Sequence, residues 1–194
     1  MRTKKQIVSA HPQTRELTPL EYVILGFLAI KPQSGYDIIN NFELGVYRAS
    51  ASTGSIYPVL KRLEKLELIG STLEVVYETR PRKVYTLRPA GEQLLDEWLR
   101  RPPSMQEVIE EYDIAMHKFL VAEYRLSRAE VLEWLDAYEQ VVTASLALRS
   151  AIIKATRGEG LSLHAQLINR AMEFEIDARL AWIKDSQARL RSTL

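Results

Sequence analysis

The stretch Ser52-Thr-Gly-Ser-Ile-Tyr-Pro-Val-Leu-Lys-Arg-Leu-Glu64 decides the fold. Its apolar residues recur at helical spacing, which predicts a helix with one face packed inward. Ser52 fits the N-cap position, whereas Pro58 suits only a first turn because proline has no N–H to donate. The helix is therefore expected to begin near Ser55 or to begin irregularly. The predicted buried face holds Ile56, Leu60, Leu63 and Leu66, and the opposite face holds Thr53, Ser55, Tyr57, Lys61, Arg62 and Lys65.

Two capping boxes lie upstream of this helix. Thr18-Pro-Leu-Glu21 predicts a helix with proline at its first position, which Lys31-Pro32 ends after Ile30. Ser34-Gly-Tyr-Asp37 predicts a second, short helix to about Phe42, followed by a loop over 45–52. We therefore expect three helices in succession, the third with a basic face.

Downstream, the period changes from that of a helix to that of a strand. Leu73, Val75 and Tyr77 alternate with other residues, as do Tyr85 and Leu87, which predicts a half-buried strand pair. Its tip, 79–83, gathers three basic side chains: Arg80, Arg82 and Lys83. A helical pattern then runs from Ala90 to Pro102-Pro103, which is the best candidate for a domain boundary.

The remainder of the chain reads as helices. Capping boxes begin at Ser104 and Ser127, and Gly158-Glu-Gly160 separates the last two helices. A heptad seam follows Ser127, with a second apolar stripe beside it at Leu135, Val142, Leu146 and Ile153. The seam comprises Val131, Trp134, Tyr138, Val141, Ser145, Leu148, Ile152 and Ala155.

These patterns predict a mainly α protein. Three short helices, a two-stranded β wing and a further helix form the winged helix-turn-helix arrangement. We expect a flexible N-terminal arm over 1–16, a winged-helix DNA-binding domain over 17–101, and a helical dimerisation and effector domain over 104–194.

Composition limits the function. The net charge is +1, but residues 1–90 carry 13 Lys and Arg against 8 Asp and Glu, and the rest carry 13 against 17. A basic first part suggests that this part meets an anionic partner. The sequence has no cysteine, which fits a reducing compartment. Its longest apolar run, 22–30, is about half as long as a membrane span. We therefore expect a soluble, cytoplasmic protein with no membrane partner.

Catalytic and cofactor motifs are absent from the sequence. No glycine-rich phosphate loop or nucleophile elbow occurs, and His11, His117 and His164 are far apart. Asp113 and His117 have the i, i+4 spacing of a metal pair, but such a pair is more often a hydrogen bond on a helix surface. We expect no catalytic residue, no metal site and no cofactor.

The third helix and the wing favour double-stranded DNA as the partner. Hydroxyls near a helix N-terminus can reach bases or phosphates, and Lys61 and Lys65 can face one backbone strand. The basic tip suits a wing that reaches a minor groove or the backbone. Ser34 and Tyr36, at the start of the second helix, complete the predicted DNA-binding set. A solvated basic helix is the plainer explanation, but it does not account for two basic elements on one small scaffold.

The 52–64 stretch resembles the central motif of the PadR family of bacterial transcriptional regulators. The resemblance takes in Leu25-Gly26 and 34–38 upstream, and 82–87 and Gly91 downstream. The end of the chain, with 181–183, is similar to the longer-tailed branch of the family. Two positions depart from it: Glu67 stands where the family usually has glycine, and Arg88-Pro89 replaces a usual threonine.

The resemblance implies a homodimeric repressor, joined by its C-terminal helices, that a small planar aromatic molecule releases from a pseudo-palindromic operator. Whether the heptad seam packs within one chain or between two chains is open, since the helix carries two stripes. The predicted dimer residues are Val131, Trp134, Tyr138, Val141, Leu148, Ile152 and Trp182. The predicted effector residues are Trp98, Tyr112, His117, Trp134 and Tyr138. The alternative is a winged helix that binds proteins and not DNA.

Overall fold

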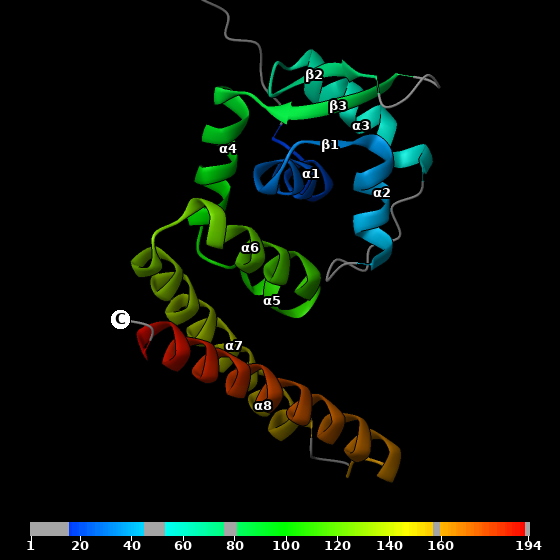
Figure 1. The fold of residues 1–194 in the computed structure, drawn as a ribbon. Coiled ribbons are helices and arrows are strands. Elements are labelled where there is room, and N and C mark those ends of the chain that lie inside the picture. The colour runs from blue at the N-terminus through cyan, green and yellow to red at the C-terminus, as the bar shows by residue number, and fades with distance from the viewer. Residues whose placement is uncertain (1–15, 45–52, 76–80, 157–159, 193–194) are drawn as a thin grey trace, which may run out of the picture.

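A computed structural model describes residues 16–44, 53–75, 81–156 and 160–192 (Figure 1). It is mainly helical, with one small antiparallel sheet. Its elements are α1 (Pro19–Ile30), β1 (Gln33–Ser34), α2 (Gly35–Leu44), α3 (Thr53–Lys65), β2 (Ile69–Glu74), β3 (Arg82–Leu87), α4 (Pro89–Arg100), α5 (Met105–Ile109), α6 (Tyr112–Arg125), α7 (Arg128–Thr156) and α8 (Leu163–Ser192).

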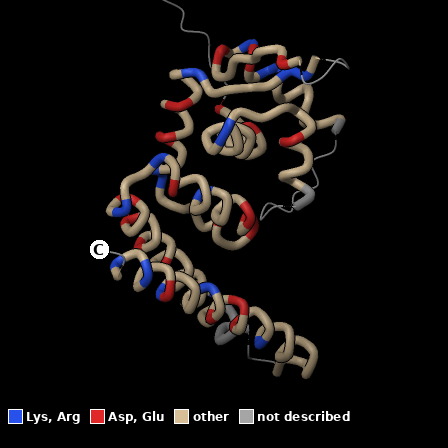
Figure 2. The backbone as a smooth tube through the Cα atoms, in the orientation of Figure 1, with Lys and Arg blue, Asp and Glu red and all other residues tan. Residues whose placement is uncertain are grey.

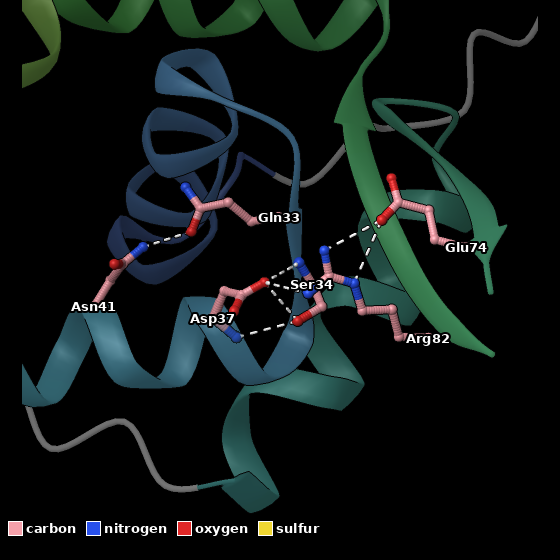
Figure 3. Close-up of polar contacts among 6 residues, drawn as sticks. All are labelled: Gln33, Ser34, Asp37, Asn41, Glu74 and Arg82. Carbon is pink, nitrogen blue, oxygen red and sulfur yellow. Dashed lines mark hydrogen bonds and ion pairs between the residues drawn. The ribbon is translucent and has the colours of Figure 1, made fainter. Parts of the chain in front are cut away.

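Both upstream capping boxes are present. The Thr18 hydroxyl accepts a hydrogen bond from the Glu21 N–H, and the Glu21 carboxylate accepts one from the Thr18 N–H at 2.7 Å. Ser34 and Asp37 exchange the same pair of bonds at the start of α2 (Figure 3). Each box satisfies N–H groups that a helix start otherwise leaves without acceptors.

The helix α3 begins at Thr53 and continues through Pro58. Ile56, Leu60 and Leu63 are fully buried, as expected. The expectation that Leu66 packs inward is wrong: its side chain is 37% exposed, because the helix has already ended at Lys65.

The end of α3 explains the unusual residue at position 67. The Leu68 N–H donates to the Leu63 carbonyl and the Glu67 N–H to the Glu64 carbonyl, which is the Schellman arrangement. Its turning residue adopts a left-handed conformation, and Glu67 has φ of 58°. Glycine adopts this conformation without a Cβ penalty, so the motif tolerates glutamate at some cost in stability.

The sheet has three strands, in the order β1-β3-β2, where the sequence predicted two. The added strand, β1, pairs Gln33 with Tyr85 and Ser34 with Val84. The wing strands pair in register from Ile69 opposite Leu87 to Glu74 opposite Arg82.

The expectation of a half-buried wing is wrong beyond its base. Leu73 is 71% exposed and Val75 is 77% exposed, whereas Ile69 is fully buried. The reason is that no described helix packs on the side chains of Leu73 and Val75. Tyr77 and Arg80 lie outside the described residues.

The helix α6 contributes to two hydrophobic cores. Ile114 and Val121 belong to the first, with α1 to α4 and the sheet, and Ala115 belongs to the second, with α5, α7 and α8. Close approach of α6 to α1 depends on Gly26, where an added Cβ would lie 2.5 Å from His117 Nε2. The boundary predicted at Pro102-Pro103 stays a prediction, but α6 lies beyond it and packs on α1.

The helices α7 and α8 form a long antiparallel hairpin that extends away from the rest of the molecule (Figure 1). Its far part leaves large apolar side chains exposed: Leu148, Leu163, Leu167, Ile168 and Phe174. Among the described residues, no helix is both long and apolar enough to cross a membrane.

Candidate nucleic-acid interface

The outward face of α3 presents two lysines on successive turns. Lys61 and Lys65 are exposed, and neither forms an ion pair with another described residue. Tyr57 is also exposed on this face, and Ser55 is partly buried. The helix position of Thr53 is described, but its side chain is not. This face therefore offers hydroxyls toward its N-terminus and positive charge toward its C-terminus.

Arg62 is placed differently from these lysines. Its Nη1 donates to Glu21 Oε1 at 2.5 Å, and the Glu21 side chain is almost completely buried. The sequence did not indicate this partner, because Glu21 is 41 residues away.

Both described basic residues of the wing also face carboxylates. Lys83 Nζ lies 2.7 Å from Glu64 Oε2, and the Ser71 hydroxyl donates to Glu64 Oε1 at 2.6 Å. These two hydrogen bonds, first that from Lys83, hold the pKa of Glu64 below its usual value. The hydrogen bond to Glu64 raises the pKa of Lys83 in turn. The two wing strands are thereby joined to the end of α3.

Arg82 lies at the junction of the wing with α2 (Figure 3). Its Nη2 is 3.2 Å from Glu74 Oε2 on β2, and its Nη1 is 3.9 Å from Asp37 Oδ2. The Ser34 hydroxyl donates to the same Asp37 oxygen at 2.7 Å, so this predicted DNA contact serves the helix cap. Hydrogen bonds from Ser34, first from its side chain, lower the pKa of Asp37.

The remaining residue of the predicted set, Tyr36, is 67% exposed beside this cap. The cap also lies against α3, since a Cβ on Gly35 would come within 2.7 Å of the Tyr57 ring. Sequence reasoning missed Gln33, whose Nε2 donates to the Phe27 carbonyl at 2.7 Å and whose Oε1 accepts from Asn41 (Figure 3). Its buried amide fixes the turn between α1 and α2.

Along α3 and the wing strands, acidic residues lie among the basic ones (Figure 2). Of the described basic side chains predicted to bind DNA, Lys61 and Lys65 carry the charge that no carboxylate neutralises. The structure thus brings together α3, the wing and the start of α2, as expected. It differs from the prediction because Arg62, Arg82 and Lys83 already face carboxylates.

The five predicted effector residues do not meet at one place. Trp98 is buried, and its ring stacks on that of Tyr22 with the ring centroids 4.8 Å apart. Lys118 Nζ lies over the Trp98 ring. Tyr112 lies under the Arg179 guanidinium. Trp134 and Tyr138 stack on each other in the second core, where burial raises the pKa of Tyr138 to about 12.

His117 is also buried. Its Nε2 lies 3.1 Å from the Val23 carbonyl oxygen, and burial lowers the pKa of His117 to about 4. A cavity of about 330 Å³ lies elsewhere, between α7 and α8, with Ile109, Leu148 and Arg179 in its lining. Among the described residues, no three His, Asp or Glu side chains gather as a metal site would require.

The first half of the heptad seam packs within the chain. Val131, Trp134 and Tyr138 are buried against neighbouring helices, and Val141 and Trp182 pack partly buried on the same core. Leu148, further along, is exposed. The side chain of Ile152 is not described. The contact of these residues with a second copy stays a prediction.

A family model described as transcriptional regulator PadR-like family matches residues 24–97, which run from α1 through the wing into α4. These residues, somewhat more than a third of the chain, are thus similar to the PadR-like family. A PadR-like relative, the negative transcriptional regulator PadR of Bacillus subtilis, is 34% identical over 122 residues. That match spans 62% of this chain and 63% of the relative, which is less than two thirds of its length.

Solved PadR structures are similar over more of the chain. Bacillus subtilis PadR in complex with operator DNA is 26% identical, with a TM-score of 0.45, covering 89% of this chain and 99% of that one. The same protein in complex with p-coumaric acid is 26% identical, with a TM-score of 0.40, covering 89% and 96%.

Proposed function

We propose that the protein is a sequence-specific, DNA-binding transcriptional repressor that acts as a homodimer on a pseudo-palindromic operator. The observation that carries this proposal is the pair of exposed lysines on α3, which form no ion pair with a described residue, beside a wing that projects from the body. The match of residues 24–97 to the PadR-like family model supports regulation of transcription, and the description of the Bacillus subtilis relative as a negative regulator supports repression.

The geometry of α3 suits a helix that enters a major groove. Its apolar side is fixed in the first core, so the helix presents one constant face. Ser55 and Tyr57 can approach base edges near its N-terminus, while Lys61 and Lys65 follow the phosphate backbone. A two-fold dimer would then place two such helices about one DNA turn apart.

We expect the double variant Lys61→Glu/Lys65→Glu to lower affinity for the DNA upstream of its own gene at least 100-fold. In a dimer the change removes four cations that face phosphates, each worth on the order of 1 kcal/mol, and adds repulsion. Fluorescence anisotropy at fixed salt measures the change, with circular dichroism to show that the variant is folded.

Lys184→Glu is the matched control, because Lys184 is an exposed lysine on α8, away from α3. Unchanged affinity of the double variant would contradict the proposal. It would favour the alternative, a winged helix that binds proteins. That alternative draws support from Arg62, Arg82 and Lys83, whose charges already face carboxylates.

For the dimer contact we propose the far part of the α7–α8 hairpin. Leu163, Leu167 and Phe174 are spaced by four and seven residues, which places them on one face of α8, and all three are exposed. Exposed apolar residues gathered in this way mark an interaction surface. A second copy, presenting the same face, would cover them by two-fold symmetry.

The variant Leu167→Glu/Phe174→Glu should be monomeric at about 10 µM, because each charge would be buried without a partner at the contact. Size-exclusion chromatography with light scattering gives the mass. Leu73→Glu/Val75→Glu is the control: it adds the same two charges at apolar positions that are 71% and 77% exposed, but on the wing. A variant that remains dimeric, or a wild-type monomer, would refute this contact.

We also propose that a planar aromatic effector weakens DNA binding. In the described structure Trp98 already has Tyr22 and Lys118 against its ring, so an effector there would have to displace one of them. Displacement would disturb the junction of α4 with α1 and α6. Phenolic acids added to the preformed DNA complex test this, and no release by any of them would remove the effector from the proposal.

A further inference from the structure

The Glu21 carboxylate is nearly inaccessible to water, being 1% exposed, and three donors surround it. The Thr18 N–H and the Thr18 hydroxyl donate to Oε2 at 2.7 and 3.1 Å. The third donor is Arg62 Nη1 on Oε1, and it comes from α3. Among these donors Arg62 is the one that brings positive charge, so it neutralises a carboxylate that the fold has buried.

Arg62 lies where it can fix the orientation of α3. Its neighbour Leu63 and Leu60, one turn earlier, are fully buried in the first core, so the ion pair lies beside the buried face. Apolar contacts are not directional, so they hold α3 against the core without fixing its rotation. A hydrogen-bonded ion pair has a preferred geometry and therefore fixes the rotation and position of the helix. The pair therefore joins the end of α3 to the first turn of α1.

The Arg62 side chain is 35% exposed, but contact with DNA through Nη1 would require this nitrogen to leave Glu21. Its departure would strand a buried carboxylate without its counter-charge, which is strongly unfavourable. The stranded carboxylate would also lie close to a polyanion. Lys61 and Lys65 have no such constraint, because they are exposed and form no ion pair with a described residue.

We propose that Arg62 is a positioning residue that orients α3 through Glu21 and makes no phosphate contact. This rests on the proposed DNA-binding function and deepens it. The two roles differ in a measurable way, since each cation that contacts a phosphate contributes about 0.9 to the slope of log K against log salt concentration. A positioning residue changes affinity without changing that slope.

The test measures binding of the full-length protein to the DNA upstream of its own gene over a series of KCl concentrations. We expect Lys61→Met and Lys65→Met each to reduce the magnitude of the slope by about 0.9 for every phosphate that the lysine no longer neutralises. Arg62→Met should weaken binding at least 10-fold with the slope of the wild type. The double variant Arg62→Met/Glu21→Gln should be folded, because no buried charge is left unpaired, but it should still bind more weakly than the wild type, because the ion pair that orients α3 is gone.

The double variant also keeps the test decisive if Arg62→Met alone fails to fold. Its slope should equal that of the wild type, and a slope reduced as in Lys61→Met would overturn the positioning role. Failure of the proposed function looks different, because the wild type itself would then show no salt-dependent binding. In that case the role of the pair is judged by thermal unfolding, where Arg62→Met should be less stable than Arg62→Met/Glu21→Gln, and equal stability would overturn it.

Discussion

Replacing Glu107 by alanine should lower the free energy of unfolding by about 3 kcal/mol and Tm by about 10 °C. Glu107 Oε1 lies 2.6 Å from Lys118 Nζ, and the Lys118 side chain is only 3% exposed. Without Glu107 the ammonium group remains buried with no counter-charge. The change also removes the acceptor for the Ser104 N–H in the capping box of α5. Thermal and urea unfolding measure the loss.

Two comparisons isolate the buried charge. Glu110→Ala removes an exposed carboxylate from the end of the same helix and should be nearly neutral. Lys118→Met/Glu107→Gln removes both charges and keeps a cap acceptor, so its stability should be within about 1 kcal/mol of the wild type. A double variant as unstable as Glu107→Ala would show that an unpaired buried charge is not what destabilises Glu107→Ala, because the double variant has no such charge and keeps the cap acceptor.

The pH dependence of Glu107→Ala has a definite sign. Burial is the main cause that lowers the pKa of Lys118 below its usual value. The unfolded chain therefore holds a proton that the folded chain binds less tightly. The penalty is present in full at low pH and fades as pH rises toward the ordinary lysine pKa, so alkaline buffer should restore part of the lost stability.

Acid should destabilise the wild-type protein through His117 by about 3 kcal/mol between pH 6.5 and pH 4. Burial lowers the pKa of this imidazole from 6.5 to about 4, and Val23 is its hydrogen-bond partner. In this interval the unfolded chain takes up a proton that the folded chain does not. The stabilisation that comes from the neutral His117 is therefore present in full above pH 6.5 and is lost as pH falls toward 4. Urea unfolding at half-unit steps of pH gives the curve.

His117→Gln should flatten the part of this curve between about pH 6.5 and 4.5, whatever its effect on stability at neutral pH. Carboxylates with lowered pKa, among them Asp37 and Glu64, lose their contribution only at lower pH, since their ordinary values are 3.8 and 4.5. His164→Gln removes an exposed histidine on α8 and serves as the control. An equally steep curve in His117→Gln would assign the acid sensitivity to another group.

Local patterns in the sequence predicted the winged helix well. Capping boxes and apolar spacing depend on residues three or four apart, so the starts of α1 and α2 and the buried face of α3 could be read directly. Similarity to the PadR-like family, whose model matches residues 24–97, was likewise visible in the 52–64 stretch. The two-residue strand β1 was not predictable, because it is too short to show alternation.

Contacts between distant residues were beyond the sequence. Nothing near Arg62 indicates that its charge is used by Glu21, and nothing near Trp98 indicates that Tyr22 and Lys118 lie against its ring. The predicted DNA-binding set therefore included cations whose charge is already neutralised. The exposed wing at Leu73 was missed for a related reason, since alternation shows two faces of a strand but not whether either is covered.

The helix α6 lies between the two cores, and this position limits how the molecule can be divided. Val23 and Phe27 of α1 lie against it, so the winged-helix half would lose one wall of its interior if the chain were cut at the two prolines. The same helix supplies Ala115, Met116 and Phe119 to the other core. Melting of either half therefore removes a surface that the other half needs, and the two should unfold as one cooperative unit and not as separable modules.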